Sequence, residues 1–162
     1  MQQPEPHREH QWLQRLVGEW TFENESNMGP DQPLVKFTGT ESVRSLGGLW
    51  TIGEGTGKMH GGGEFKSIMT LGFDPVTRRF VGTFVASMMT HLWPYIGKLD
   101  VEERVLTLDS EGPSCADDGT IAKYQDMIEF ISNDHRTLSS QYVGPDGNWM
   151  LFMKANYFRV SS

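Results

Sequence analysis

The sequence predicts an all-β protein, a closed antiparallel up-and-down β-barrel of about ten strands with a short N-terminal helix plugging one end. One segment near the N-terminus has apolar residues at helical spacing, and the rest of the chain consists of short β-rich runs separated by turn residues. Such runs are typical of sequential hairpins, and closure of the sheet removes its exposed edges. A β-sandwich is the alternative architecture.

The helix is predicted over residues 6–16, where charged and polar side chains cover one face and the apolar residues recur at helical spacing: Trp12, Leu13, Leu16 and Val17. We expect Gly18 to end the helix, because a residue without Cβ adopts the left-handed conformation that closes helices. Residues 1–5 are expected to form a flexible tail, and residues 6–162 a single barrel domain.

The strands are predicted from runs of β-branched and aromatic residues between turn signals such as Asp74-Pro75 and Asp146-Gly147. The predicted runs cover residues 20–25, 34–46, 49–59, 65–73, 79–89, 92–99, 104–109, 120–132, 137–143 and 148–160.

The positions of charged residues within a strand indicate which side chains face the interior. In residues 122–131, Lys123, Gln125 and Glu129 share one side, which leaves Asp126 inside. The same reasoning places Glu41 inside, and it places the odd-numbered residues from Trp149 to Arg159 on one inner face. A bare buried carboxylate costs several kcal/mol, so both acids need a partner. Arg44, Arg159 and Tyr124 are the candidates, either for a structural pair or for a general base or polar anchor in a cavity.

Gly53, Gly55 and Gly57 alternate in one predicted strand, so one of its faces has no side chains. The spacing does not match a phosphate-binding loop, because Ile52 stands at the position of the first glycine. Strong bending or close approach of the helix explains the pattern, and a ligand lying on bare backbone is the alternative.

The best candidate site is residues 87–95, which concentrate methionine and aromatic residues around His91. Packing of these residues in the core is the alternative interpretation. The predicted lining of the cavity is Phe37, Trp50, Met69, Phe84, Met88, His91, Tyr95, Tyr124, Trp149 and Met153, with Glu41 and Asp126 as polar anchors.

Other candidate motifs indicate ordinary structural roles. His7, Glu9 and His10 are expected to form a solvated helix face rather than a metal site, and His60 to be a turn residue. Ser114 and Cys115 lie in a polar loop without a nucleophile motif, so no catalytic role is assigned to them.

Composition restricts the classes of partner. The 162 residues fit one domain, and their net charge of −7 without a basic cluster disfavours nucleic acid. Cys115 is the single cysteine, so no intrachain disulfide forms. No segment has the apolar run of a signal peptide or a membrane span, and a cytoplasmic location is expected.

The two ends of the chain resemble those of the calycins, the group that includes the lipocalins. Leu16-Val17-Gly18-Glu19-Trp20 is similar to their G-x-W opening, and Tyr157-Phe158-Arg159 is similar to their final strand. This resemblance implies that Arg159 lies across Trp20 at the closed end of a barrel, as a cation–π pair.

Most of the chain also resembles a bacterial domain-of-unknown-function family, number 1579, with a calycin-like barrel and no assigned activity. The residues that carry the resemblance are His10-Gln11-Trp12-Leu13, Gly47-Gly48-Leu49, Leu71-Gly72-Phe73-Asp74, Phe80-Val81, Asp146-Gly147 and Tyr157-Phe158-Arg159. A more distant resemblance is to nitrobindin-type barrels, which bind haem through a late histidine. Residues 148–160 contain no histidine, and His135 is the latest candidate.

The leading functional hypothesis is binding of a small hydrophobic or amphipathic molecule, with no cofactor. A second hypothesis is an enzyme, either a haem barrel acting on reactive nitrogen species or a cofactor-free isomerase using His91 with an inward carboxylate. A third is a barrel packed solid with side chains that acts through protein contacts or as a homodimer.

Overall fold

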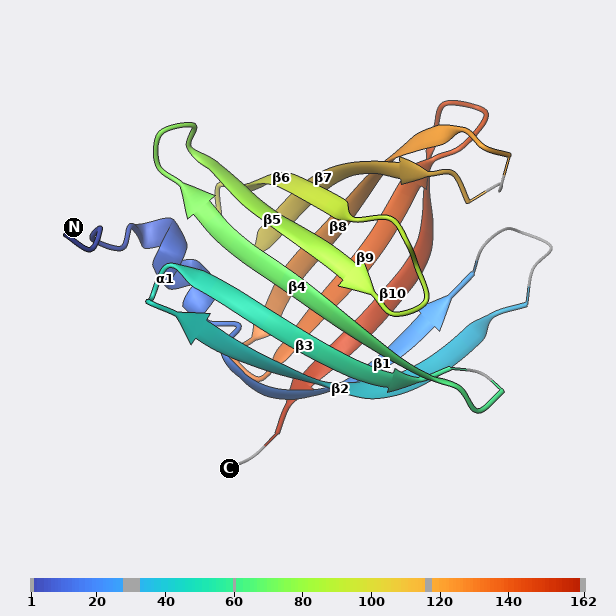
Figure 1. Cartoon of the computed structure of the whole chain (residues 1–162), viewed down its shortest axis with the longest axis horizontal. Coiled ribbons are helices and arrows are strands. Elements are labelled where there is room, and N and C mark those ends of the chain that lie inside the picture. Colours follow the sequence, from blue (N-terminus) through green and yellow to red (C-terminus); the bar gives the residue numbers. More distant parts are fainter. Residues whose placement is uncertain (1, 28–32, 60, 116–117, 161–162) are drawn as a thin grey trace.

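The computed structural model describes residues 2–27, 33–59, 61–115 and 118–160, and these residues form a closed antiparallel barrel (Figure 1). Each strand pairs with the next along the chain, and the last pairs with the first, so the predicted up-and-down barrel is confirmed. The strands are β1 (Gly18–Ser26), β2 (Val35–Leu46), β3 (Trp50–Lys58), β4 (Glu64–Asp74), β5 (Arg79–Ala86), β6 (Trp93–Leu99), β7 (Val105–Pro113), β8 (Ile121–Ser132), β9 (His135–Val143) and β10 (Trp149–Arg159).

Alternation of side chains along the strands builds the interior. In β1, Trp20, Phe22 and Asn24 are buried while Thr21 and Glu23 between them are exposed. This alternation is typical of a sheet with one solvent-exposed face, and it recurs in β7 and β8. The core is therefore the inside of the barrel.

The helix α1 (Arg8–Gln14) covers one end of the barrel, beside the turns that join β3 to β2 and β4 to β5 (Figure 1). His10 anchors it: the His7 backbone N–H donates to Nδ1 at 2.8 Å, and Nε2 lies 3.0 Å from the Phe73 carbonyl oxygen. His10 is buried, contrary to the expectation of a solvated face.

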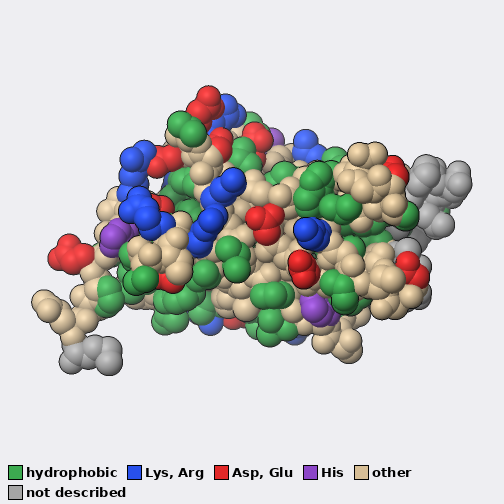
Figure 2. All heavy atoms as spheres, turned by 90° about the horizontal axis from the view of Figure 1, so that it is seen from above, with side chains coloured by type: hydrophobic (Ala, Val, Ile, Leu, Met, Phe, Trp, Pro, Cys, Tyr) green, Lys and Arg blue, Asp and Glu red, His purple; other side chains and the backbone are tan. Residues whose placement is uncertain are grey.

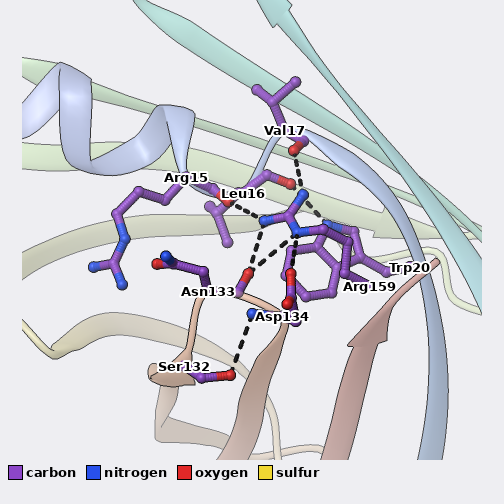
Figure 3. A network of polar contacts seen from close by, with 8 residues as sticks. All are labelled: Arg15, Leu16, Val17, Trp20, Ser132, Asn133, Asp134 and Arg159. Carbon is purple, nitrogen blue, oxygen red and sulfur yellow. Dashed lines mark hydrogen bonds and ion pairs between the residues drawn. The ribbon is translucent and has the colours of Figure 1, made fainter. Parts of the chain in front are cut away.

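Trp20 and Arg159 close the barrel at the same end (Figure 3). The guanidinium carbon of Arg159 lies 4.2 Å from the centre of the Trp20 ring, and the buried indole donates to the Leu16 carbonyl at 2.8 Å. Arg159 also donates to backbone carbonyls of Arg15 and Val17 at 3.0 and 2.8 Å, and to that of Asn133. One side chain thus ties the segment after α1, the turn between β8 and β9, and the end of β10 together.

Gly18 has a different role from the one predicted. The helix ends at Gln14 with Arg15 as its C-cap, so Gly18 does not terminate it. Instead Gly18 begins β1 with φ of +139°, and a Cβ built on it would overlap the guanidinium of Arg159. The glycine of the G-x-W opening is therefore required by both its backbone conformation and the late arginine.

Acidic, basic and apolar side chains are interspersed over the face shown in Figure 2. In the described ranges, no helix is both long enough and apolar enough to cross a membrane.

The closure predicts a specific loss of stability for Arg159→Lys. Lysine keeps the charge, but its single ammonium group cannot replace the planar guanidinium that donates to three carbonyls. The free energy of unfolding should therefore fall by about 2 to 3 kcal/mol. Urea denaturation measures this change. Arg44→Lys is the matched control, because Arg44 forms an exposed ion pair with Glu54 on the outer surface and should cost less than about 0.5 kcal/mol. Equal stability of the two variants would contradict the role given to Arg159.

Candidate functional site

The barrel encloses a cavity of about 580 Å³. It extends from Leu16, next to the helix end, to residues 88–91 in the connection between β5 and β6 at the opposite end. Met88 and Met89 line it while remaining exposed, so they form its mouth. Its apolar wall includes Phe22, Phe37, Val43, Phe65, Met69, Leu71, Phe84, Trp93, Ile128, Leu138, Phe152, Met153 and Tyr157.

An ion pair lies near the closed end. Arg136 Nη2 donates to Glu41 Oε1 at 2.5 Å, and their side chains are 4% and 13% exposed. The guanidinium carbon of Arg136 lies 4.0 Å from the centre of the Tyr157 ring and 4.6 Å from that of Trp20. Burial, followed by the negative charge of Glu41, raises the pKa of the Tyr157 hydroxyl. Glu41 is thus paired, as a buried carboxylate requires.

A second polar cluster lies on β6, β8 and β9. Tyr95 and Ser140 both donate to the Asp126 carboxylate, the latter at 2.6 Å. Burial raises the pKa of Asp126, although both hydrogen bonds act to lower it. Burial also raises the pKa of Tyr95, assisted by the neighbouring charge of Asp126. Among the described residues no cation contacts this carboxyl, so desolvation favours its protonated form.

The mouth carries a third set of polar groups. His91 Nε2 lies 3.0 Å from the Glu111 carbonyl oxygen, and its ring meets that of Trp93 edge-on at 4.6 Å. Tyr124 donates to the Pro113 carbonyl, and the Cys115 sulfur lies 3.3 Å from the Tyr124 hydroxyl. Burial, followed by the hydrogen bond with Cys115, raises the pKa of Tyr124.

The alternating glycines of β3 face the barrel interior. A Cβ on Gly53 would lie 3.1 Å from the Glu41 carboxylate, and one on Gly55 would lie 2.7 Å from Ser67 Oγ. A Cβ on Gly57 would meet the Phe65 ring at 2.5 Å. The bare face therefore makes room for side chains of the neighbouring strands and leaves Gly53 and Gly55 in the cavity wall.

Most of the predicted lining residues do face the cavity, together with both predicted anchors: Phe37, Met69, Phe84, Met88, His91, Tyr95, Tyr124, Met153, Glu41 and Asp126. The placement of Trp50 and Trp149 was wrong. Trp50 lies on the outer face of β3, opposite in parity to the inward glycines, and its ring covers Gly72. The register shifts between Leu151 and Met153, and this shift reverses which side chains at the start of β10 face the interior. Trp149 is therefore exposed, and Phe152 faces inward.

The predicted partners of the two carboxylates were also wrong. Arg44 pairs with Glu54 outside the barrel, Arg159 covers Trp20, and Tyr124 donates to Pro113. Of the actual partners, Tyr95 lies on β6, whereas Arg136 and Ser140 lie on β9, where polar residues occupy both faces and parity gives no signal. Arg136 also precedes the predicted start of that strand.

The histidines are dispersed. His135 bonds to Asn156 at 2.9 Å and stacks on Phe158, away from the cavity lining, so it is not placed to hold a haem there. His60 lies outside the described residues. Across the part of the chain that the structure describes, no cluster of three or more His, Cys, Asp or Glu side chains is arranged to hold a metal.

His91 and Asp126 do not form a direct acid–base pair. The His91 ring lies against Gly112, whereas Asp126 is opposite Leu108, four residues further along β7. At about 3.4 Å per residue these two strand positions lie roughly 14 Å apart, too far for direct proton transfer. The isomerase hypothesis therefore lacks a contact between His91 and Asp126.

The burial of Asp126 predicts an unusual dependence of stability on pH. Above the ordinary aspartate pKa of 3.8, the folded protein keeps a proton that the unfolded chain has lost. Unfolding then releases a proton, so this residue's contribution to stability falls as the pH rises from 3.8 to the raised pKa.

Asp126→Asn removes this titration. In urea denaturation between pH 4 and 8, the stability of the variant relative to the parent should therefore increase with pH, by about 1.4 kcal/mol for each pKa unit of elevation. A difference that stays constant with pH would show that Asp126 titrates normally.

Comparisons with known proteins agree with this architecture. Rv2717c from M. tuberculosis has a TM-score of 0.66 at 14% identity, with 97% of this chain and 100% of that chain covered. A de novo designed fluorescence-activating β-barrel has a TM-score of 0.50 at 12% identity, covering 91% and 95%. EF1p2_mFAP2b bound to DFHBI has a TM-score of 0.50 at 13% identity, covering 93% and 98%. At these identities the similarity shows the fold alone.

A comparison with curated proteins gave no match. The family model described as protein of unknown function (DUF1579) matches residues 5–159. Since this match spans almost the entire barrel, from the segment before α1 to Arg159, the chain belongs to the DUF1579 family of proteins of unknown function.

Proposed function

We propose that this protein binds a small, largely apolar molecule inside the barrel. The observation that carries the proposal is the cavity of about 580 Å³, which is walled mainly by aromatic and aliphatic side chains. Ligand sites commonly have volumes of about 300 to 1,000 Å³ and combine an apolar wall with a few placed polar groups. Glu41, Arg136 and Asp126 are such groups here.

The size of the cavity argues against the packed-barrel hypothesis. A barrel of this size holds either interdigitated side chains or one small ligand, and packed interiors have few voids larger than a water molecule. Gly53 and Gly55 add no side chains of their own to this wall. The similar barrel EF1p2_mFAP2b, which has DFHBI bound, supports the same proposal.

The mouth is suited to the entry of apolar molecules of varied shape. Met88 is 52% exposed and Met89 is 39% exposed, and both reach the cavity wall. Methionine is unbranched and polarizable, so it adapts to different apolar surfaces at little cost. This property supports an apolar ligand whose tail lies at the mouth.

Filling the cavity should weaken binding. Ser67 lies in the wall on β4, and Ser67→Phe places a ring in the cavity, so binding of the uncharged fluorophore Nile red should weaken at least about tenfold. Fluorescence titration measures the dissociation constant. Ile68→Phe is the matched control, because the adjacent Ile68 is exposed on the outside of the same strand.

Two results would overturn the proposal. One is the absence of one-to-one binding of Nile red to the parent protein. The other is equal affinity for the dye in the parent and in a folded Ser67→Phe variant, since the dye would then lie on the outer surface.

A further inference from the structure

We infer that the cavity selects uncharged amphipathic molecules bearing a hydrogen-bond acceptor, such as a ketone, ester or amide carbonyl, and rejects carboxylates. The acceptor would lie toward the closed end, beside Arg136, and the apolar part toward the mouth. This inference rests on the proposed binding function and specifies the chemical class of its ligand.

Unsatisfied donors in the wall indicate the acceptor. Arg136 Nε and Ser110 Oγ are buried without a hydrogen-bond partner among the described residues, and both residues line the cavity. Ser110 pairs with Tyr124 toward the mouth, so Arg136 Nε is the unsatisfied donor at the closed end. Arg136 is 3% exposed and Ser110 is 9% exposed. Buried polar groups are normally paired, because an unmade hydrogen bond leaves the cost of desolvation uncompensated. A ligand oxygen near Arg136 would compensate part of that cost.

The charge balance of the wall excludes an anion. Arg136 is the one lysine or arginine among the described lining residues, and Glu41 already occupies one edge of its guanidinium. The faces of the guanidinium lie against the rings of Trp20 and Tyr157. A ligand carboxylate placed at Arg136 would be repelled by Glu41 and would have no second cation to replace its lost hydration.

The wall does not attract a cation either. The two oxygens of Asp126 already accept hydrogen bonds from Tyr95 and Ser140, and Glu41 is paired with Arg136. An ammonium group would therefore lose its hydration without finding an unpaired carboxylate. With anionic and cationic ligands disfavoured, an uncharged head group that accepts a hydrogen bond from Arg136 fits the cavity.

The first test compares two ligands of matched chain length. Binding of 2-nonanone and of nonanoate is measured by displacement of Nile red at about pH 7.5, where nonanoate is ionised. We expect 2-nonanone to bind at least about tenfold more tightly. On lowering the pH to about 4, where a simple carboxylic acid is mostly protonated, the acid should approach the affinity of the ketone.

The second test reverses the selectivity by Glu41→Gln. The substitution keeps the shape of the side chain and leaves Arg136 without its counter-charge, so nonanoate should bind at least about tenfold more tightly than to the parent. Binding of 2-nonanone is measured in the same variant, and the ratio of nonanoate affinity to 2-nonanone affinity should rise at least about tenfold over that of the parent. Glu54→Gln is the control, because it removes the same charge from an exposed ion pair on the outside of β3 and should alter neither affinity.

The outcomes separate the two proposals. Equal binding of nonanoate and 2-nonanone by the parent, or no gain for nonanoate in folded Glu41→Gln, overturns the selectivity while leaving the binding function intact. If neither molecule displaces Nile red, and Ser67→Phe does not weaken the dye, the binding function itself is overturned. The comparison of ligands and of pH needs no variant, so it decides the question even if Glu41→Gln fails to fold.

Discussion

The contact between Arg159 and Trp20 is the interaction on which the rest of the structure depends. It joins the first strand to the last, and the same guanidinium binds carbonyls of the segment after α1 and of the turn between β8 and β9. Without the pairing of β1 with β10, at whose end this contact lies, the sheet would have two free edges and no enclosed volume. The cavity is thus a consequence of closure, and Gly18 is part of it because a side chain there would collide with Arg159.

The closure and the candidate site share one residue. The Trp20 ring contacts the guanidinium of Arg159, which seals the barrel, and that of Arg136, which faces the cavity. Trp20 is fully buried and lies opposite Glu41 in the sheet. The Glu41–Arg136 pair therefore lies at the same end of the barrel as Trp20. The ion pair is therefore held at the closed end of the cavity, and the adaptable methionines remain at its mouth.

The two acidic side chains inside the barrel leave it without an uncompensated charge. Glu41 is neutralised by Arg136, and the carboxyl of Asp126 is held by two hydroxyl groups in a site where burial favours its protonated form. Both arrangements reduce the cost of polar groups inside an apolar barrel. They also leave few unsatisfied atoms, of which Arg136 Nε and Ser110 Oγ lie in the cavity wall.

The sequence by itself determined the ten strands, their order and the inward carboxylates, because hairpin turns and the period-two pattern are local signals. The contact of Arg159 with Trp20 followed from the resemblance of the two chain ends to known barrels, and the structure confirms it. Only the tertiary structure decided which residues pair with those carboxylates. It also decided which side chains in the first half of β10 face inward. The Glu41–Arg136 contact joins residues 95 positions apart on strands that are not neighbours in the sheet, so no local pattern encodes it. At β10, a one-residue bulge reverses which side chains face inward, which put Trp149 outside and Phe152 inside.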